Sequence, residues 1–154
     1  ERKALFLLDG NWYGNDTLWR SILDLNYLLF SFDKNGMQTK SKARNYICIT
    51  DGIIAGEGDG PLDPIPRQAG ILAISENPVI NDLCISRLLG FDWHKIPQIE
   101  KSIRLKEVFR FDGDCSSIKI VQISDSSESK MIPFLKLPSL NFLPPPGWIN
   151  QIEL

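Results

Sequence analysis

Short apolar runs and helical stripes of apolar residues alternate along the first two thirds of the chain. Residues 4–8 and 46–50 are mostly apolar, and an Asp-Gly dipeptide follows each run. A third apolar run covers residues 70–75. Continuous apolar runs of this length are typical of strands buried on both faces of a parallel sheet. We therefore predict three strands of this kind.

Two longer stretches carry apolar side chains at helical spacing. The first has Asn15 or Asp16 as its cap and runs to about Phe32. Its apolar stripe consists of Leu18, Ile22, Leu25 and Leu29. The second follows the cap Asn77 and ends at Gly90, a residue suited to a left-handed helix end. Its stripe consists of Val79, Ile80, Leu83, Cys84 and Leu88.

The remaining segments give weaker local signals. A short helix is expected after Pro97. Residues 52–67 are rich in Gly, Pro and acids, which predicts a long ordered loop. Residues 107–111 and 118–124 favour the two strands of an edge hairpin. The Pro-rich residues 143–148 are interpreted as a strap across the body, with an extended recognition element as the alternative.

The order of these elements indicates an α/β fold: a mostly parallel sheet with flanking helices, plus a small C-terminal β-hairpin and an irregular Pro-rich tail. We expect residues 1–105 to form the α/β core, as the C-terminal part of a larger domain. Residues 106–154 form the β-hairpin and the Pro-rich tail packed on the same domain. Because an apolar strand starts almost at the first residue, we expect partner strands from an upstream part of the same protein.

Composition narrows the classes of partner. Hydrophobic residues make up 43% and charged residues 23% of the 154-residue chain, and the net charge is −2. No apolar run is long enough for a membrane span, and no long basic block exists. We therefore predict a cytoplasmic protein with no membrane and no nucleic-acid partner. Cys48, Cys84 and Cys115 are too far apart for a zinc or iron–sulfur motif, so no iron–sulfur cluster is expected within this fragment.

Acidic side chains follow two of the predicted strands. Asp9 and Asp51 come directly after the first two apolar runs, and Glu57 follows in the Gly-rich segment. In open α/β sheets, ligands bind at the carboxyl ends of the strands. Clustered carboxylates repel one another unless a cation intervenes, and oxygen ligands favour Mg, Mn or Ca. These three residues are the predicted ligands of a divalent metal.

Further polar residues flank the same two turns. Arg20 and Arg67 are interpreted as clamps for a small anionic ligand, because an arginine pairs bidentately with phosphate or carboxylate. The full predicted ligand-binding set is Asn11, Asn15, Asp16, Arg20, Asp59 and Arg67. An equally weighted alternative is that these acids and amides only cap helices and fix turns. Catalytic residues cannot be assigned from the sequence.

Common enzyme motifs do not match. The Gly-rich residues 56–61 lack the Gly-Lys-Ser/Thr of a P-loop and are followed by prolines rather than a helix. The single histidine, His94, has no nucleophile near it in the sequence, so we expect a structural role.

The chain resembles the family named domain of unknown function 362. Residues 51–61 and 70–73, Asn77-Pro78, Asp82, residues 88–92 and Ile96-Pro97 look like the second half of that domain, and residues 9–20 look like one of its subgroups. The resemblance implies an α/β fold and a cytoplasmic, bacterial type of protein. It implies no established reaction, although some relatives are joined to ferredoxin-like iron–sulfur modules.

Three hypotheses follow for function. The first is a domain that binds a divalent metal and/or a small anionic ligand at the acidic Gly-rich loop, with or without a metal-assisted enzymatic activity. The second is a redox-associated module that partners an iron–sulfur domain. The third is a non-catalytic interaction domain that uses the Pro-rich tail.

Overall fold

The computed structural model describes residues 10–39, 43–123 and 128–154. The predicted strand at residues 4–8 and the predicted metal ligand Asp9 lie outside these ranges. The helices and strands, in chain order, are α2 (Leu18–Ser31), β1 (Cys48–Asp59), β2 (Asp63–Ser75), α3 (Pro78–Leu89), α4 (Pro97–Ser102), α5 (Lys106–Phe109), β3 (Lys119–Ile123) and β4 (Ser129–Pro133). Short 3-10 turns join the later elements, including η6 (Pro146–Trp148) in the tail.

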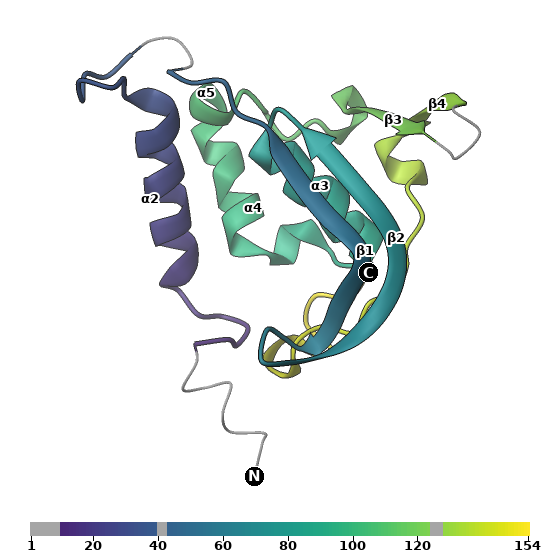
Figure 1. The fold of residues 1–154 in the computed structure, drawn as a ribbon. Coiled ribbons are helices and arrows are strands. Elements are labelled where there is room, and N and C mark those ends of the chain that lie inside the picture. Colours follow the sequence, from purple (N-terminus) through teal and green to yellow (C-terminus); the bar gives the residue numbers. More distant parts are fainter. Residues whose placement is uncertain (1–9, 40–42, 124–127) are drawn as a thin grey trace.

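The sheets are antiparallel, so the predicted parallel sheet with flanking helices is wrong. Among the described residues, β1 pairs only with β2 and β3 only with β4, each pair forming a two-stranded sheet. In the first pair Ile49 lies opposite Ile74, and Asp59 lies opposite Asp63. The apolar runs that suggested two buried strands are instead neighbouring arms of one long hairpin (Figure 1).

Residues 52–67, predicted as a loop, form most of this hairpin. Glycines on β1 face prolines on β2: Gly56 is paired with Pro66, and Gly58 with Pro64. A Cβ atom on Gly56 would lie 2.7 Å from Cβ of Pro64, so only glycine fits there. Proline is tolerated in this sheet because each strand has one edge that needs no backbone donor. Asp51 therefore lies within a strand rather than at the end of one.

The two faces of the hairpin differ. Thr50 and Ala73 on the inner face are half-buried, and Asn81 Nδ2 of α3 donates a hydrogen bond to Thr50 Oγ1 at 2.9 Å. On the outer face Ile49, Leu72 and Ile74 are each more than 60% exposed. The continuous apolar runs therefore do not indicate strands buried on both faces. In the part of the chain that the structure describes, these side chains on the outer face stay exposed.

Helix α3 has the ends that the sequence predicts. Asn77 Oδ1 accepts hydrogen bonds from the backbone N–H groups of Val79 and Ile80, and Gly90 ends the helix with a φ of 87°. Leu83, on the predicted stripe, is completely buried. Such a cap and a left-handed glycine depend on a few neighbouring residues, which makes them readable from the sequence.

Helix α2 differs from the prediction in its start and in its buried face. The N-cap is Thr17, without a side-chain cap hydrogen bond, and not Asn15 or Asp16, while the end at Ser31 agrees with the predicted end near Phe32. Leu18 and Leu25, placed on the predicted stripe, are each 67% exposed, whereas Leu23 and Phe30 are buried. Phe30 packs edge-on against Phe109 with the ring centroids 5.9 Å apart. The core joins α2, α3 and α4 to the C-terminal segments through Leu23, Phe30, Val79, Leu83, Ile99, Phe109, Phe111, Ile118, Phe134 and Leu137.

The C-terminal part differs from prediction in one strand. Residues 107–111 do not form a strand, because α5 and the left-handed Arg110 occupy that position. The hairpin instead pairs β3 with β4. After it, the tail crosses the body: the backbone N–H groups of Leu140 and Phe142 donate to the carbonyl oxygens of Leu88 and Leu89, at 2.8 Å each. Residues 140–142, just before the Pro-rich run, therefore lie beside the end of α3.

Candidate functional site

A hollow of about 810 Å³ lies where the start of α2, the β1–β2 turn, the start of α4 and the Pro-rich tail meet. We call it the tail hollow. Three residues of the predicted ligand-binding set, Asn11, Asn15 and Asp59, line it. Its complete lining is Gly10, Asn11, Asn15, Leu18, Trp19, Ile22, Asp59, Gly60, Pro61, Leu62, Asp63, Pro97, Gln98, Pro146 and Trp148.

One wall joins the segment before α2 to the tail. Asn11 Oδ1 accepts a hydrogen bond from Trp148 Nε1 at 2.9 Å, and the backbone N–H of Tyr13 donates to the carbonyl oxygen of Gly147 at 2.9 Å. The Tyr13 ring meets the Trp148 ring edge-on, with centroids 5.5 Å apart. Segments more than 130 residues apart are thus fixed to each other across this wall.

Asn15 shapes the adjacent turn. Its Nδ2 donates to the carbonyl oxygen of Gly10 at 2.9 Å, while its Oδ1 accepts from the backbone N–H of Thr17 at 2.9 Å. Gly10 has a φ of 70°, a left-handed conformation that glycine adopts without strain. Asn15 therefore serves the local fold as well as lining the hollow, as the alternative interpretation of these amides predicts.

The opposite wall is the turn of the β1–β2 hairpin. The bond between Gly60 and Pro61 is cis. On either side of the turn, Asp59 and Asp63 occupy directly opposed positions of the two strands and both line the tail hollow. Two carboxylates at opposed positions repel each other.

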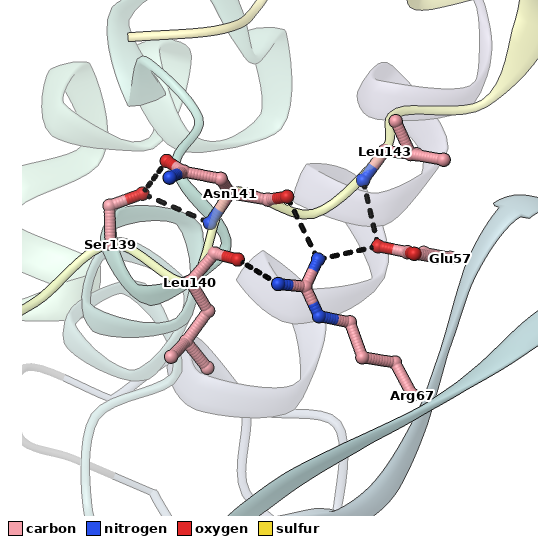
Figure 2. Close-up of polar contacts among 6 residues, drawn as sticks. All are labelled: Glu57, Arg67, Ser139, Leu140, Asn141 and Leu143. Carbon is pink, nitrogen blue, oxygen red and sulfur yellow. Dashed lines mark hydrogen bonds and ion pairs between the residues drawn. The ribbon is translucent and has the colours of Figure 1, made fainter.

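Arg67 and Glu57 together hold the tail (Figure 2). Arg67 Nη1 lies 2.8 Å from Glu57 Oε2 and donates to the carbonyl oxygen of Asn141 at 2.8 Å, and Nη2 donates to the carbonyl oxygen of Leu140. The backbone N–H of Leu143 donates to the same Glu57 oxygen at 3.0 Å. We call this arrangement the tail clamp.

The tail clamp uses two residues that were predicted to bind ligands. The hydrogen bond from Arg67, followed by that from the Leu143 N–H, lowers the pKa of Glu57, so the carboxylate is charged and satisfied. The Arg67 guanidinium also lies over the Phe142 ring, 4.7 Å from its centroid. Neither Glu57 nor Arg67 lines the tail hollow.

Asp16 and Arg20 form a second arginine–carboxylate pair beside the hollow. Arg20 Nη2 lies 2.7 Å from Asp16 Oδ2, and the Arg20 guanidinium covers one face of Trp19 at 4.6 Å from the ring centroid. Trp19 Nε1 donates to Asp16 Oδ1 at 2.9 Å. Hydrogen bonds from Arg20 and then Trp19 lower the pKa of Asp16. The pair positions Trp19, which is one wall of the hollow.

The predicted metal ligands do not meet in the described part of the chain. Asp51 Oδ1 accepts a hydrogen bond from the backbone N–H of Ile53 at 3.1 Å, and Glu57 belongs to the tail clamp. Residues 10–39, 43–123 and 128–154 contain no group of three or more His, Cys, Asp or Glu side chains placed to hold a metal ion. The divalent metal stays a prediction.

The cysteines and His94 take no part in the hollow. All three cysteines are free, and burial raises the pKa of the Cys84 thiol to about 11, which disfavours the reactive thiolate. His94 stacks on Trp93 with ring centroids 3.7 Å apart, and its Nδ1 lies 2.8 Å from Asp92 Oδ1.

Sequence reasoning missed several residues of the hollow, most importantly Trp19 and Trp148. A tryptophan in a helix or a tail usually packs in the core, so the residue type alone does not indicate a binding site. The one usable signal was the lone tryptophan at the end of the Pro-rich run, which needs a surface to cover it.

Comparison with known proteins gives a local match. A thylakoid-associated protein of Synechocystis sp. is 39% identical over 59 residues, which are 38% of this chain. The matched stretch is 18% of that protein, so the chain spans less than a fifth of the relative's length. No family model matches the chain, and no solved structure matches it. In the part of the chain that the structure describes, no helix combines the length and apolar character needed to cross a bilayer.

Proposed function

We propose that this domain binds a small organic ligand in the tail hollow. One observation carries the proposal: Asn11 and Asn15 before α2 and Asp59 at the hairpin turn, all selected from the sequence as ligand-binding residues, line the same concavity. Its volume of about 810 Å³ falls within the range of small-molecule sites, roughly 300 to 1,000 Å³.

The character of the walls supports the same conclusion. Two indole rings, Leu18, Ile22 and several prolines supply carbon surface, while a few carboxylates and amides supply polar atoms. Binding sites for organic molecules combine a mostly apolar lining with a few fixed polar groups. Hydrogen bonds to Asp16 and Asn11 fix the indoles of Trp19 and Trp148 before any ligand arrives.

The other predicted ligands are separate proposals. An anion would need a free cationic side chain, but Arg20 and Arg67 are each paired with a carboxylate. A divalent metal at Asp9, Asp51 and Glu57 also stays a proposal, since Asp9 lies outside the described residues while Asp51 and Glu57 are held by other partners. Membership of the domain-of-unknown-function 362 family, with a redox or an interaction role, remains a further proposal based on sequence resemblance alone.

The location of the protein is also a proposal. Free cysteines and a net charge of −2 are consistent with the cytoplasm. The thylakoid association of the Synechocystis relative offers a second location for a cyanobacterial homologue. Fractionation of cells into membranes and cytosol, followed by immunodetection, distinguishes the two.

Nuclear magnetic resonance of the tryptophan side chains tests ligand binding. The indole N–H signals of Trp19 and Trp148 report on the tail hollow, and that of Trp93, stacked on His94 outside it, is an internal control. In a screen of small organic fragments, we expect binders that shift the first two signals and leave the third in place. A screen in which no fragment moves Trp19 or Trp148 contradicts the proposal.

A further inference from the structure

The outer side of the β1–β2 hairpin is apolar along the half farthest from the turn. Alternation along the two strands places a set of aliphatic side chains on this one side of the sheet. We call this surface the hairpin face and define it by Ile47, Ile49, Asp51, Ile53, Leu72 and Ile74. Its five aliphatic side chains are 58% to 67% exposed, so they stay open to solvent in the part of the chain that the structure describes.

The hairpin face has the size of a contact surface. Five aliphatic side chains at this exposure present roughly 400 Å² of apolar surface. The largest apolar patch of a monomer covers about 300 to 600 Å² and is often functional. A dimer interface of standard size buries about 800 Å² per partner, about two thirds of it apolar. The hairpin face therefore supplies most of the apolar area that one side of a dimer needs.

The composition of the hairpin face favours a second copy of the chain over a different protein. Contacts between different proteins are enriched in aromatic rings, methionine and arginine, and the six residues of the face include none of these. Homodimer contacts are more apolar, and one aliphatic surface matches another without any charged group from the partner. The single ionisable side chain of the face is Asp51, whose Oδ1 accepts a hydrogen bond from the Ile53 N–H at 3.1 Å.

The edges of the hairpin disfavour the addition of further strands near the turn. Pro64 and Pro66 of β2 have no backbone N–H to offer to a neighbouring strand. On β1, the Gly58 N–H donates to the carbonyl oxygen of Leu143 in the tail at 3.0 Å. Prolines and covered edges protect a sheet against edge-to-edge pairing. A second copy therefore meets the face of this sheet rather than its edge.

We infer that two copies of the chain form a dimer in which the two hairpin faces pack against each other. A two-fold axis along the hairpins lays β1 of one copy over β2 of the other, so Ile49 meets Ile74 and Asp51 meets Leu72. An axis across the hairpins would instead bring the two Asp51 carboxylates together. Because a two-stranded sheet has no central strand, Asp51 stays at the margin of the contact, within reach of water. The inference is independent of the proposed function, since no residue of the hairpin face lines the tail hollow.

Sedimentation of the full chain tests the dimer. We expect a mass twice that of one chain at micromolar concentrations. Ile49→Lys places a charge in the contact and should raise the dissociation constant of the dimer by about tenfold or more. Leu25→Lys on α2 is the matched control, because Leu25 is 67% exposed like Ile49, and it should leave the constant unchanged. Ile74→Lys, on the other strand, repeats the test if thermal melting shows that Ile49→Lys is unfolded.

Isotope-filtered nuclear Overhauser effects between a labelled and an unlabelled copy test the arrangement. Methyl contacts from Ile49 to Ile74 of the second copy support it, whereas contacts from Ile49 only to the second Ile49 overturn it. A chain that sediments as a monomer at every concentration overturns the inference and leaves the hairpin face to a different partner. A dimer that Ile49→Lys and Ile74→Lys both leave intact also overturns it, because such a dimer uses another surface.

Discussion

Two arginine–carboxylate pairs of nearly equal length have different roles in this protein. Arg20 and Asp16 are 2.7 Å apart and their side chains are 57% and 68% exposed, whereas Arg67 and Glu57 are 2.8 Å apart and only 35% and 12% exposed. The first pair joins residues four apart at the start of α2. The second joins two strands to the tail. The distance between the charged atoms therefore does not show which pair contributes more to stability. The further hydrogen-bond partners of the arginine and the carboxylate do.

The partners of the second pair are backbone groups far away in the sequence. Without Arg67, the carbonyl oxygens of Leu140 and Asn141 lose their donor, and Glu57 is left beside the Leu143 N–H alone. The same tail continues to Trp148, a wall of the tail hollow. The tail clamp thus ties the hairpin to the tail that supplies the Trp148 wall, while the Asp16–Arg20 pair acts on Trp19.

The largest expected effect is that of Arg67→Ala. It removes hydrogen bonds from a charged donor to three acceptors, and we expect a loss of about 2 to 3 kcal/mol in the free energy of unfolding. Arg67→Lys keeps the charge but not the planar fork, and about half of that loss should remain. Urea unfolding measures both. A loss below about 0.5 kcal/mol for Arg67→Ala, the level of an ordinary exposed pair, would remove the distinction between the two pairs.

Glu57→Gln should have a smaller effect. The amide keeps an oxygen that can accept from Arg67 and Leu143, but it loses the charge, and we expect a loss of about 1 kcal/mol. Asp51→Asn, on the same strand with only a local partner at Ile53, is the matched control and should change the urea midpoint much less. Equal effects of the two substitutions would contradict the special position of Glu57.

The pH dependence of stability sharpens the same comparison. Because the folded pKa of Glu57 is lowered by Arg67 and then by the Leu143 N–H, the unfolded chain binds a proton at this site more readily than the folded one. This contribution to stability is present above the ordinary value of 4.5 and is lost as the pH falls below it. Acid titration of urea stability should therefore show a shallower decline for Glu57→Gln than for the unsubstituted chain.

The smallest expected effect belongs to Arg20→Ala. The pair is exposed and its arginine contacts Asp16 and Trp19, both within four residues, so water replaces the pair readily. We expect no measurable change in the urea midpoint, and the Trp19 indole signal should move while that of Trp148 stays in place. A destabilisation similar to that of Arg67→Ala would show that local and tail-binding pairs are equivalent here.

The sequence predicts those parts of the fold that depend on near neighbours. Asn77 and Gly90 define α3 because a cap and a left-handed end need only three or four adjacent residues. The β1–β2 hairpin was missed because it depends on the pairing of residues such as Gly56 with Pro66. A segment rich in Gly and Pro is typical of a loop when only its composition is considered. The fold class failed for the same reason, since a continuous apolar run does not distinguish a parallel from an antiparallel neighbour.

The residues of the candidate site that the sequence predicts are likewise those with a local signal. Asn11, Asn15 and Asp59 were selected because amides and carboxylates after apolar runs often face a ligand, and all three line the tail hollow. Arg67 was assigned to a ligand, yet its partners are tail carbonyls more than 70 residues away. Trp148 was not assigned because its place depends on the path of the tail, which local patterns do not encode.

Hydrogen exchange of two backbone amides tests most directly whether the tail clamp builds the hollow. The Leu143 N–H is held by Glu57, and the Tyr13 N–H is held by the carbonyl oxygen of Gly147 in one wall of the hollow. In Arg67→Lys we expect both amides to exchange at least tenfold faster, with the α3 amides unchanged, and in Arg20→Lys we expect neither to change. Unchanged rates at Leu143 and Tyr13 in Arg67→Lys would contradict the clamp, as would an equal acceleration in Arg20→Lys.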